Sequence, residues 1–208
     1  MRITAVKGAG QPFRDHAAVF VIRLRQHDDK LRHAAPRDNV AAPQIAAQQR
    51  RQLFHHAVQT AARKGGTVLR RHRQQTDTVK GMTAAEASCN SGGVIIMVSS
   101  CIDGHGGQSL YDTFASGEDK NVIMQRFLDT PRDKTIPDQW EAQILCRVLL
   151  HHKVIMVTQA PKQLVNDMQM DYAESVDEAI RMADAYLGKT DSKITVIPDG
   201  VSVIVRKK

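Results

Sequence analysis

Two continuous apolar runs constrain the fold of this chain more than any other feature. Residues 92–100 read GGVIIMVSS and residues 153–158 read KVIMVT, and both runs are rich in β-branched or bulky apolar side chains. A strand with one face in water alternates apolar and polar residues, whereas a continuous apolar strand is typical of a parallel sheet that is buried on both faces. The sequence therefore predicts a sheet with helices on both sides.

Helical signals separate these runs and the later strand KITVI, residues 193–197. Capping boxes, which pair a small polar residue with Glu three positions later, predict helix starts at Thr83, Asp138 and Ser175. Gly188 is expected to end the last of these helices, and Pro161 to begin a shorter one. Helices are expected over 84–90, 108–115, 121–129, 140–152 and 176–187; the third of these should place Val122, Met124, Phe127 and Leu128 on or near one side.

Strands and helices that alternate in this way favour a three-layer α/β fold with a mostly parallel sheet. Residues 198–200 read PDG, a tight-turn signal, and residues 201–205 read VSVIV. We therefore expect a C-terminal hairpin at the edge of the sheet.

The chain before Val79 has a different composition. Residues 1–78 hold 15 Lys and Arg against five Asp and no Glu, a formal charge of +10, whereas residues 79–208 hold 14 against 17, a charge of −3. A strand over 19–24 and a thin helix over 44–62 are expected there, in a segment that is otherwise poorly structured or irregularly helical. We predict two units: a basic segment, 1–78, and an α/β domain, 79–208.

Charge and composition allow alternative roles for the basic segment. Lys and Arg can neutralise phosphates, so a nucleic-acid-binding or interaction protein is one reading, although residues 1–78 contain no helix-turn-helix, zinc-finger or stacking-aromatic pattern. An Arg-rich transit peptide is another reading, which Asp15, Asp28 and Asp29 disfavour. Neither a membrane-spanning run nor a secretion signal is present in the sequence, which predicts a cytoplasmic protein.

Cysteine and histidine spacing gives little support for a metal site. Cys89, Cys101 and Cys146 are odd in number and lack metal-ligand spacing, so we expect reduced core thiols. The pairs 55–56 and 151–152 are adjacent histidines, and adjacent residues on a helix do not face the same way. No residue is therefore predicted to bind a metal.

Residues 103–107, Asp-Gly-His-Gly-Gly, follow a predicted buried strand and precede a helix. Ligands of open α/β sheets gather beyond the carboxyl ends of the strands, and glycines there allow the backbone to approach an anion. Alternatively, these glycines are present only because the chain makes a tight turn there. His105 could serve as an acid, a base or a ligand, or could anchor the loop through a hydrogen bond.

Lys80 and Trp140 each have two readings. Lys80 lies just before the helix that the Thr83 box predicts, where it could attract a carboxylate, or it is simply a solvated lysine. Trp140 is the only tryptophan and falls in the first turn of a helix, where an indole can line a pocket or pack in the core.

Four segments in this order resemble the carboxy-terminal domain of the nickel-dependent lactate racemase family. They read VKGMTAAEAS, GGVIIMVSSCIDGHGG, DQWEAQIL and KITVIPDGVSVIV, and the resemblance covers residues 79–208. It implies a domain that closes over a nickel pincer nucleotide, which takes a hydride from C2 of a 2-hydroxy acid such as lactate and returns it to either face. The resemblance further implies that Lys80 and Trp140 face the substrate and cofactor.

The resemblance also implies what this chain lacks. In the family, the amino-terminal domain carries the catalytic histidines and the nickel ligands, and no residue before Val79 lies in a matching motif. Thr76, Asp77 and Thr78 stand where the family has aromatic and amide residues. We therefore assign no catalytic residue to the chain, expect it to be inactive and unable to hold the cofactor alone, and expect the missing domain as its partner. Residues 1–78 look like the translation of a wrong reading frame or the product of a misplaced start.

Overall fold

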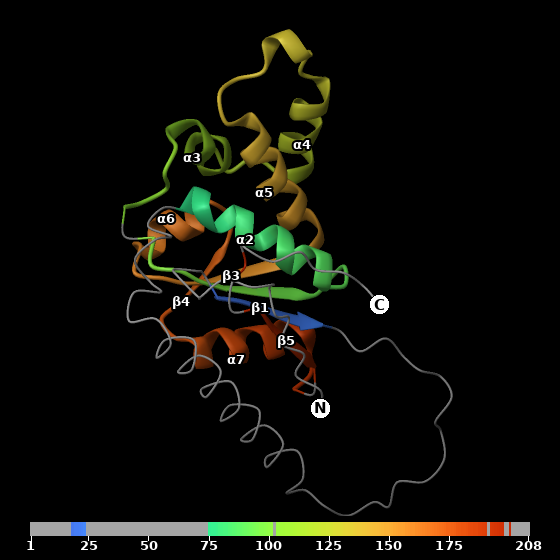
Figure 1. Ribbon diagram of the computed structural model, residues 1–208, viewed down its shortest axis with the longest axis vertical. Helices are drawn as coiled ribbons and strands as arrows, with labels where there is room; N and C mark the ends of the chain where they lie inside the picture. Colours follow the sequence, from blue (N-terminus) through green and yellow to red (C-terminus); the bar gives the residue numbers. More distant parts are fainter. Residues whose placement is uncertain (1–17, 24–74, 102, 191, 198–199, 201–208) are drawn as a thin grey trace, which may run out of the picture.

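The computed structural model describes residues 18–23, 75–101, 103–190, 192–197 and 200. These residues form a five-stranded sheet in the order β4-β3-β2-β1-β5 (Figure 1). The strands are β1 (Ala18–Arg23), β2 (Val94–Val98), β3 (Lys153–Val157), β4 (Asp171–Ala173) and β5 (Lys193–Ile197).

Strands β2, β3 and β4 form the parallel part of the sheet. Val94 of β2 lies opposite Lys153 of β3, and Ile155 of β3 lies opposite Asp171 of β4. β1 runs antiparallel to both β2 and β5, so β5 has the same direction as β2 but does not pair with it. The parallel sheet is confirmed, while the short strand β4 was not predicted.

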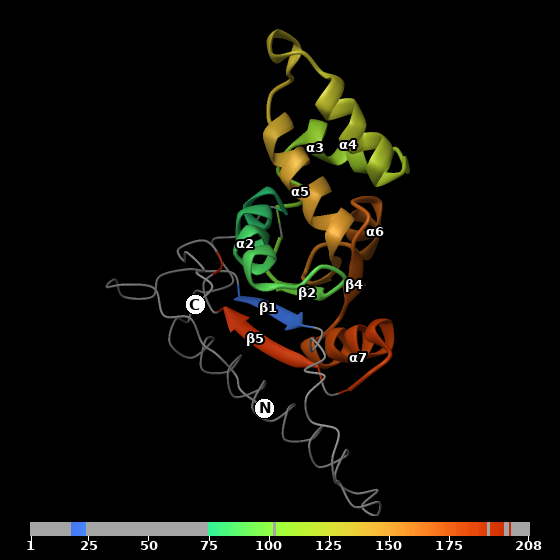
Figure 2. The same ribbon diagram turned by 90° about the vertical axis from the view of Figure 1, so that its right-hand side faces the viewer.

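Helices cover both faces of the sheet. In Figures 1 and 2, α7 (Val176–Leu187) lies on one face, and α2 (Gln75–Ser88) and α5 (Gln139–His151) lie on the other. The remaining helical elements are α3 (Gln108–Ala115), α4 (Lys120–Asp129), a 3₁₀ turn, η1 (Arg132–Lys134), and α6 (Lys162–Asp167). The three-layer α/β architecture is therefore confirmed.

Side chains of β2 alternate between two cores. Ile95 and Met97 belong to the core beneath α2 and α5, whereas Val94 and Ile96 belong to the core beneath α7. All four are completely buried. A strand enclosed on both faces must be apolar at every position, which explains the continuous run in the sequence.

The Thr83 capping box is a wrong prediction, because α2 begins at Gln75 and Thr83 lies inside the helix. The Thr83 hydroxyl donates to the Lys80 carbonyl oxygen at 2.7 Å, a bond that Thr makes within a helix instead of capping one. Val79, Met82 and Ala85 are buried at helical spacing, so packing extends the helix past the local signal.

The other helix starts were predicted with mixed success. Ser175 caps α7 as expected, accepting from the Glu178 amide at 3.2 Å, and Gly188 ends that helix in the left-handed region at φ +65°. Asp138 precedes α5, but its side chain makes no capping bond. Pro161 precedes α6 instead of occupying its first position.

On α4 the buried positions only partly match the predicted apolar side, of which Phe127 is buried and Met124 is partly buried and packs on the core. Ile123 and Phe127 are buried, whereas Val122 and Leu128 are exposed. The prediction of buried thiols is confirmed, since Cys89, Cys101 and Cys146 are all buried and none of them forms a disulfide.

Only one of the elements predicted for the basic segment falls within the described residues. The strand expected over 19–24 is present as β1, which lies inside the sheet, so this part of the segment is not irregular. The helix expected over 44–62 and the C-terminal strand over 201–205 lie outside the described residues.

Candidate functional site

The predicted site residues lie on the two helices that precede neighbouring parallel strands. α2 leads into β2 and α5 leads into β3, and the two helices pack against each other. Lys80 lies in the first half of α2, and Trp140 in the first turn of α5. The start of α5 extends away from the sheet toward α3 and α4 (Figures 1 and 2), and the loop 103–107 connects β2 with α3.

Lys80 is exposed on the outer side of α2. Its neighbours Val79 and Met82 point into the core, which fixes the orientation of the helix and leaves the lysine toward solvent. Contrary to prediction, Lys80 lies within a helix and not before one. An ammonium group there is accessible to an anionic partner or ligand.

Trp140 is also accessible, since 52% of its surface is exposed. Gln139 and Glu141 on either side of it are buried, so the first turn of α5 is firmly packed while the indole projects outward. The core reading of Trp140 is therefore wrong. A large exposed apolar side chain on a rigid helix is typical of a contact surface or a pocket wall.

Cys101 and the loop 103–107 contain several residues in the left-handed region. Cys101, Gly104 and Gly106 have φ values of +44°, +81° and +80°. The Gly107 amide donates to His105 Nδ1 at 3.2 Å, so this histidine anchors the loop. The neutral ring consequently carries its proton on Nε2, the other nitrogen.

His105 stacks on Tyr111, with ring centroids 4.9 Å apart. The Tyr111 hydroxyl donates to Asp167 Oδ2 at 2.6 Å, and this hydrogen bond raises the pKa of Tyr111 above its ordinary value. Sequence reasoning missed this pair, because Tyr111 and Asp167 are 56 positions apart and no local spacing relates them. The pair joins the middle of α3 to the end of α6.

The loop after β2 is also tied to α5 and β3. Ser109 Oγ donates to the Pro137 carbonyl oxygen at 3.4 Å, which connects α3 with the segment just before Trp140. Thr158 Oγ1, after β3, donates to the Ser100 carbonyl oxygen at 3.0 Å. These two bonds connect the chain after β2 with the segment before α5 and the segment after β3.

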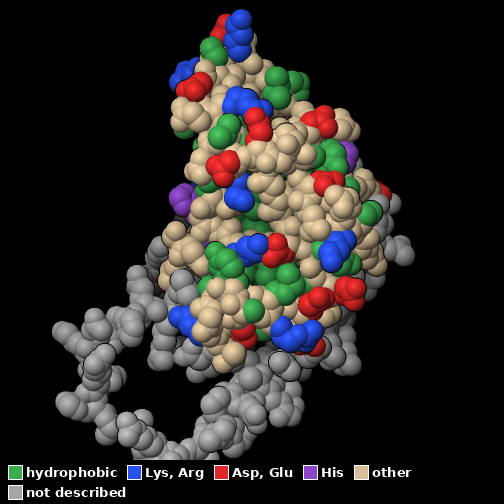
Figure 3. Space-filling view, turned by 180° about the vertical axis from the view of Figure 1, so that it is seen from behind, with side chains coloured by type: hydrophobic (Ala, Val, Ile, Leu, Met, Phe, Trp, Pro, Cys, Tyr) green, Lys and Arg blue, Asp and Glu red, His purple; other side chains and the backbone are tan. Residues whose placement is uncertain are grey.

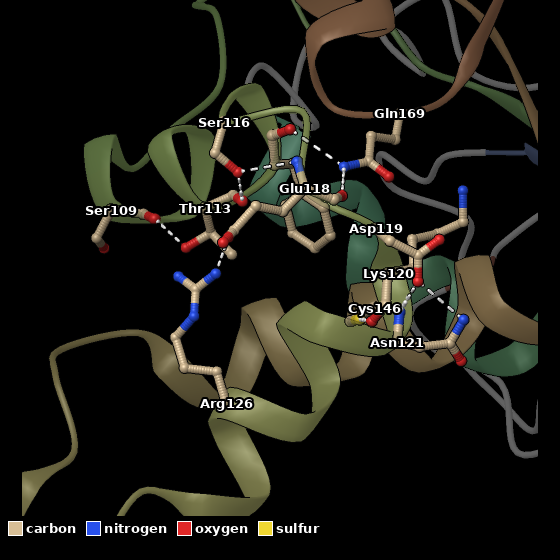
Figure 4. A network of polar contacts seen from close by, with 11 residues as sticks. Ser109, Thr113, Ser116, Glu118, Asp119, Lys120, Asn121, Arg126, Cys146 and Gln169 are labelled. Atoms are coloured by element: carbon tan, nitrogen blue, oxygen red, sulfur yellow. Dashed lines mark hydrogen bonds and ion pairs between the residues drawn. The ribbon is translucent and has the colours of Figure 1, made fainter.

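The turn between α3 and α4 is held from a distant part of the chain (Figure 4). Gln169 Nε2 donates to the carbonyl oxygens of Phe114 and Glu118, at 3.2 and 2.9 Å. Glu118 forms an ion pair with Arg126 on α4, and Asp119 caps α4 by accepting from the Asn121 amide at 2.8 Å. These contacts fix the end of α3.

The described residues contain no group of three or more His, Cys, Asp or Glu side chains placed to hold a metal ion. His152 is buried, His151 is exposed, and their ring centroids lie 6.4 Å apart. An open groove lies elsewhere, on α4 and the chain that follows it. Its lining residues are Val122, Gln125, Arg126, Asp129, Thr130, Pro131 and Lys134.

Charges of both signs are interspersed over the face in Figure 3, which shows no broad field of one sign. A phosphate-binding surface would gather Lys and Arg on one face.

Among the helices of the described part, none is long and apolar enough to cross a bilayer.

Comparison with known proteins identifies close relatives. The chain is 53% identical over 132 residues to a lactate racemase of Thermoanaerobacterium thermosaccharolyticum, covering 63% of this chain and 31% of that protein. It is 49% identical over 129 residues to a lactate racemase of Lactiplantibacillus plantarum, covering 62% and 30%. The chain thus spans about a third of the length of either relative.

A solved structure agrees with these matches. The lactate racemase apoprotein of T. thermosaccharolyticum superposes with a TM-score of 0.64 and 48% identity, covering 69% of this chain and 34% of that one. The model of the lactate racemase C-terminal domain family matches residues 60–205, beginning before Val79. Since this match covers well over half of the sequence, the chain belongs to the lactate racemase C-terminal domain family.

Proposed function

We propose that this chain supplies one wall of the pocket of a 2-hydroxy-acid racemase, and that another polypeptide supplies the catalytic half. The relatives are lactate racemases, and the chain spans only about a third of their length. The proposed substrate is lactate or another 2-hydroxy acid.

The observation that carries the proposal is the exposure of Lys80 and Trp140. α2 and α5 pack against each other, and each presents one of these side chains outward from an otherwise buried stretch. The Lys80 ammonium would attract a carboxylate or a phosphate, and the Trp140 indole would exclude water from the reacting carbon. Neither residue donates or accepts the reacting proton.

The cofactor implied by the family is a nickel pincer nucleotide, which supplies hydride acceptance and return when bound. The described residues offer no set of nickel ligands, and we propose that those ligands come from the other polypeptide. Lys80 and Trp140 suit a supporting role, as a cation for a phosphate or carboxylate and as an apolar wall. We propose that the cofactor is bound only in the assembled pocket.

Two further parts of the proposal rest on sequence. We propose a cytoplasmic location, and the buried free thiols are compatible with a reducing compartment. We also propose that much of the segment before Val79 is a frame-shifted translation, although the family match reaches back to residue 60. Finding no racemase-like catalytic sequence in the other two frames of the encoding DNA would refute that origin.

Complementation tests the function. The chain is mixed with the cofactor-loaded amino-terminal half of a lactate racemase, and conversion of L-lactate to D-lactate is measured by chiral chromatography. We expect activity from the mixture and none from this chain alone. Racemisation by the chain without its partner would overturn the proposal, as would an inactive mixture in which the two halves form a complex.

Matched variants test the two site residues. Lys80→Ala and Trp140→Ala should each lower the activity of the mixture by about 10-fold or more, because each removes an interaction near the reacting centre. Lys189→Ala and Tyr186→Ala are the controls, since Tyr186 lies on α7 and Lys189 follows that helix, and the exposure of Tyr186, 55%, is close to the 52% of Trp140. Equal losses in all four variants would remove the assignment.

A further inference from the structure

The direction of the Trp140 indole depends strongly on the backbone that carries it, because about half of this side chain is exposed. In a helix, the backbone sets the direction in which a side chain leaves it. Trp140 lies in the first turn of α5 and follows directly on residues 136–139, which read Ile-Pro-Asp-Gln. The conformation of these four residues therefore helps to determine where the indole points.

Residues 136–139 form a β-turn. The Gln139 amide donates to the Ile136 carbonyl oxygen at 3.2 Å, and Asp138, the third residue, has φ +60° and ψ +10°. Proline at the second place and a left-handed third residue are typical of a type II turn, which favours Gly or Asn at the third place. Asp138 is neither. A non-glycine residue in this conformation costs free energy, so the turn needs support from its surroundings.

The side chain of Gln139 supplies such support. Its Oε1 atom accepts from the Ile136 amide at 3.3 Å, so these two residues are joined by two hydrogen bonds of opposite direction. Gln139 is only 7% exposed, whereas glutamine is mostly found on protein surfaces. Because burial of an amide group is costly unless the group is hydrogen-bonded, the buried position indicates that the bond to Ile136 is the task of this side chain.

Further contacts fix the turn to its neighbours. Ser109 Oγ on α3 donates to the Pro137 carbonyl oxygen at 3.4 Å, and the Glu141 amide donates to the Asp138 carbonyl oxygen at 3.0 Å. Glu141 is buried like Gln139, so the two residues that flank Trp140 are both held in the interior while the indole projects outward.

We propose that Gln139 is a positioning residue for Trp140. Its side-chain oxygen keeps the turn 136–139 closed, so that the indole already has its working direction before the catalytic half binds. This role rests on the proposed function, in which Trp140 forms a wall of the pocket. Preorganisation of this kind avoids the cost of ordering a side chain when the pocket assembles.

Time-resolved fluorescence anisotropy of the full chain tests the proposal, since Trp140 is the only tryptophan. Gln139→Met removes the oxygen acceptor at nearly constant length. The part of the anisotropy that is lost within nanoseconds should then rise about 2-fold or more, because the indole gains local motion. Gln139→Glu keeps an oxygen acceptor and should restore the original decay. Gln125→Met, at an exposed position of α4, is the control and should leave the decay unchanged.

Hydrogen exchange in the unaltered chain tests the bond itself, even if Gln139→Met does not fold. The Ile136 amide should exchange about 10-fold or more slowly than an unbonded loop amide, because it donates to the buried Gln139 oxygen. Exchange of Ile136 at the rate of an unbonded amide would overturn the proposal.

Racemisation by the complemented mixture separates positioning from general stability. Gln139→Met should lower kcat by about 5-fold with KM nearly unchanged, since a displaced indole acts on the reacting complex. In a Trp140→Ala background the same substitution should cost nothing more, because the residue that Gln139 positions is gone.

Equal losses of kcat in both backgrounds would overturn the positioning role, as would an unchanged anisotropy decay in Gln139→Met. An inactive mixture of the unaltered halves would refute the proposed function instead. The anisotropy and exchange measurements need no turnover, so they decide the role of Gln139 in that case too.

Discussion

Glu86 and Arg147 form the best-defined ion pair between helices of the described part. Arg147 Nε and one terminal nitrogen donate to the two Glu86 oxygens at 2.9 and 2.8 Å, which joins α2 to α5. The hydrogen bond to Glu86 raises the pKa of Arg147. Because half of the Arg147 side chain is exposed, solvent screens the pair, and its contribution to stability is modest.

Arg147→Lys should lower the free energy of unfolding by about 0.5–1 kcal/mol, because lysine cannot reproduce the two parallel hydrogen bonds. Urea denaturation measures the change. Glu86→Gln in a double-mutant cycle isolates the pair energy, which should shrink in high salt. A coupling energy of zero at low salt would show that the pair is not stabilising.

His152 is buried at the end of α5, and its Nδ1 atom has no hydrogen-bond partner within the described residues. Burial lowers the pKa of His152 below its ordinary value of 6.5, and the nearby His151 lowers it further. Glu86 and the Asn90 backbone act in the opposite direction. The folded protein therefore favours the neutral ring.

A histidine whose pKa is lowered by folding binds its proton more readily in the unfolded chain, so stability rises with pH. As the pH falls below 6.5, the ordinary pKa of histidine, the folded state should lose stability relative to the unfolded chain. The loss should stop once the pH has fallen below the pKa of His152 in the folded protein. Melting temperatures between about pH 7 and about pH 5 measure this loss. His152→Asn should flatten the profile, and the exposed neighbour variant His151→Asn should not; identical profiles for all three proteins would contradict the assignment.

At the scale of elements, α7 shows how local signals fix a helix. The Ser175 hydroxyl caps its first turn, Glu178 Oε2 accepts from the Glu174 amide at 2.8 Å, and Gly188 adopts the left-handed conformation that ends it. A Cβ atom at Gly188 would contact no neighbouring atom, so glycine is favoured there only by the left-handed backbone conformation.

Ser175→Ala should destabilise the domain by about 1 kcal/mol, since the Glu178 amide loses its acceptor. Ser175→Asp is the matched control, because aspartate accepts the same bond and suits the positive end of the helix. Urea denaturation of the three proteins decides the matter. An alanine variant as stable as the aspartate variant would exclude a contribution from the cap.

Local signals predicted the elements that depend on neighbours in sequence, as α7, β2 and β3 illustrate. They failed for α2, where buried Val79 and Met82 extend the helix through Thr83, and for β4, whose three residues carry no pattern. Lys80 and Trp140 were selected through the family resemblance. The link from Tyr111 to Asp167 depends on chain crossovers that no short-range spacing encodes.

At the scale of the whole molecule, the fluorescence of Trp140 can be used to measure the association of this chain with the catalytic half. Trp140 is the only tryptophan in the sequence, and about half of it is exposed. Its fluorescence therefore comes from the surface that we propose faces the catalytic half.

Adding that half should shift the tryptophan emission to shorter wavelength, because the indole would leave water for an apolar contact. Titration gives the affinity without any enzymatic turnover, provided that the added half is itself free of tryptophan. Trp140→Phe gives the background signal. Complex formation without a spectral change would place the contact surface elsewhere.

The brevity of β4 has a consequence for the behaviour of the protein in solution. As the outermost strand beside β3, it offers another chain only three residues of backbone, and Lys153 of β3 bonds Asp171 there at 2.7 Å. Short edges that carry charge are poor templates for sheet-to-sheet growth. This flank of the molecule is thereby protected against amyloid-like stacking, even though the strands behind it are as apolar as those of fibril-forming peptides.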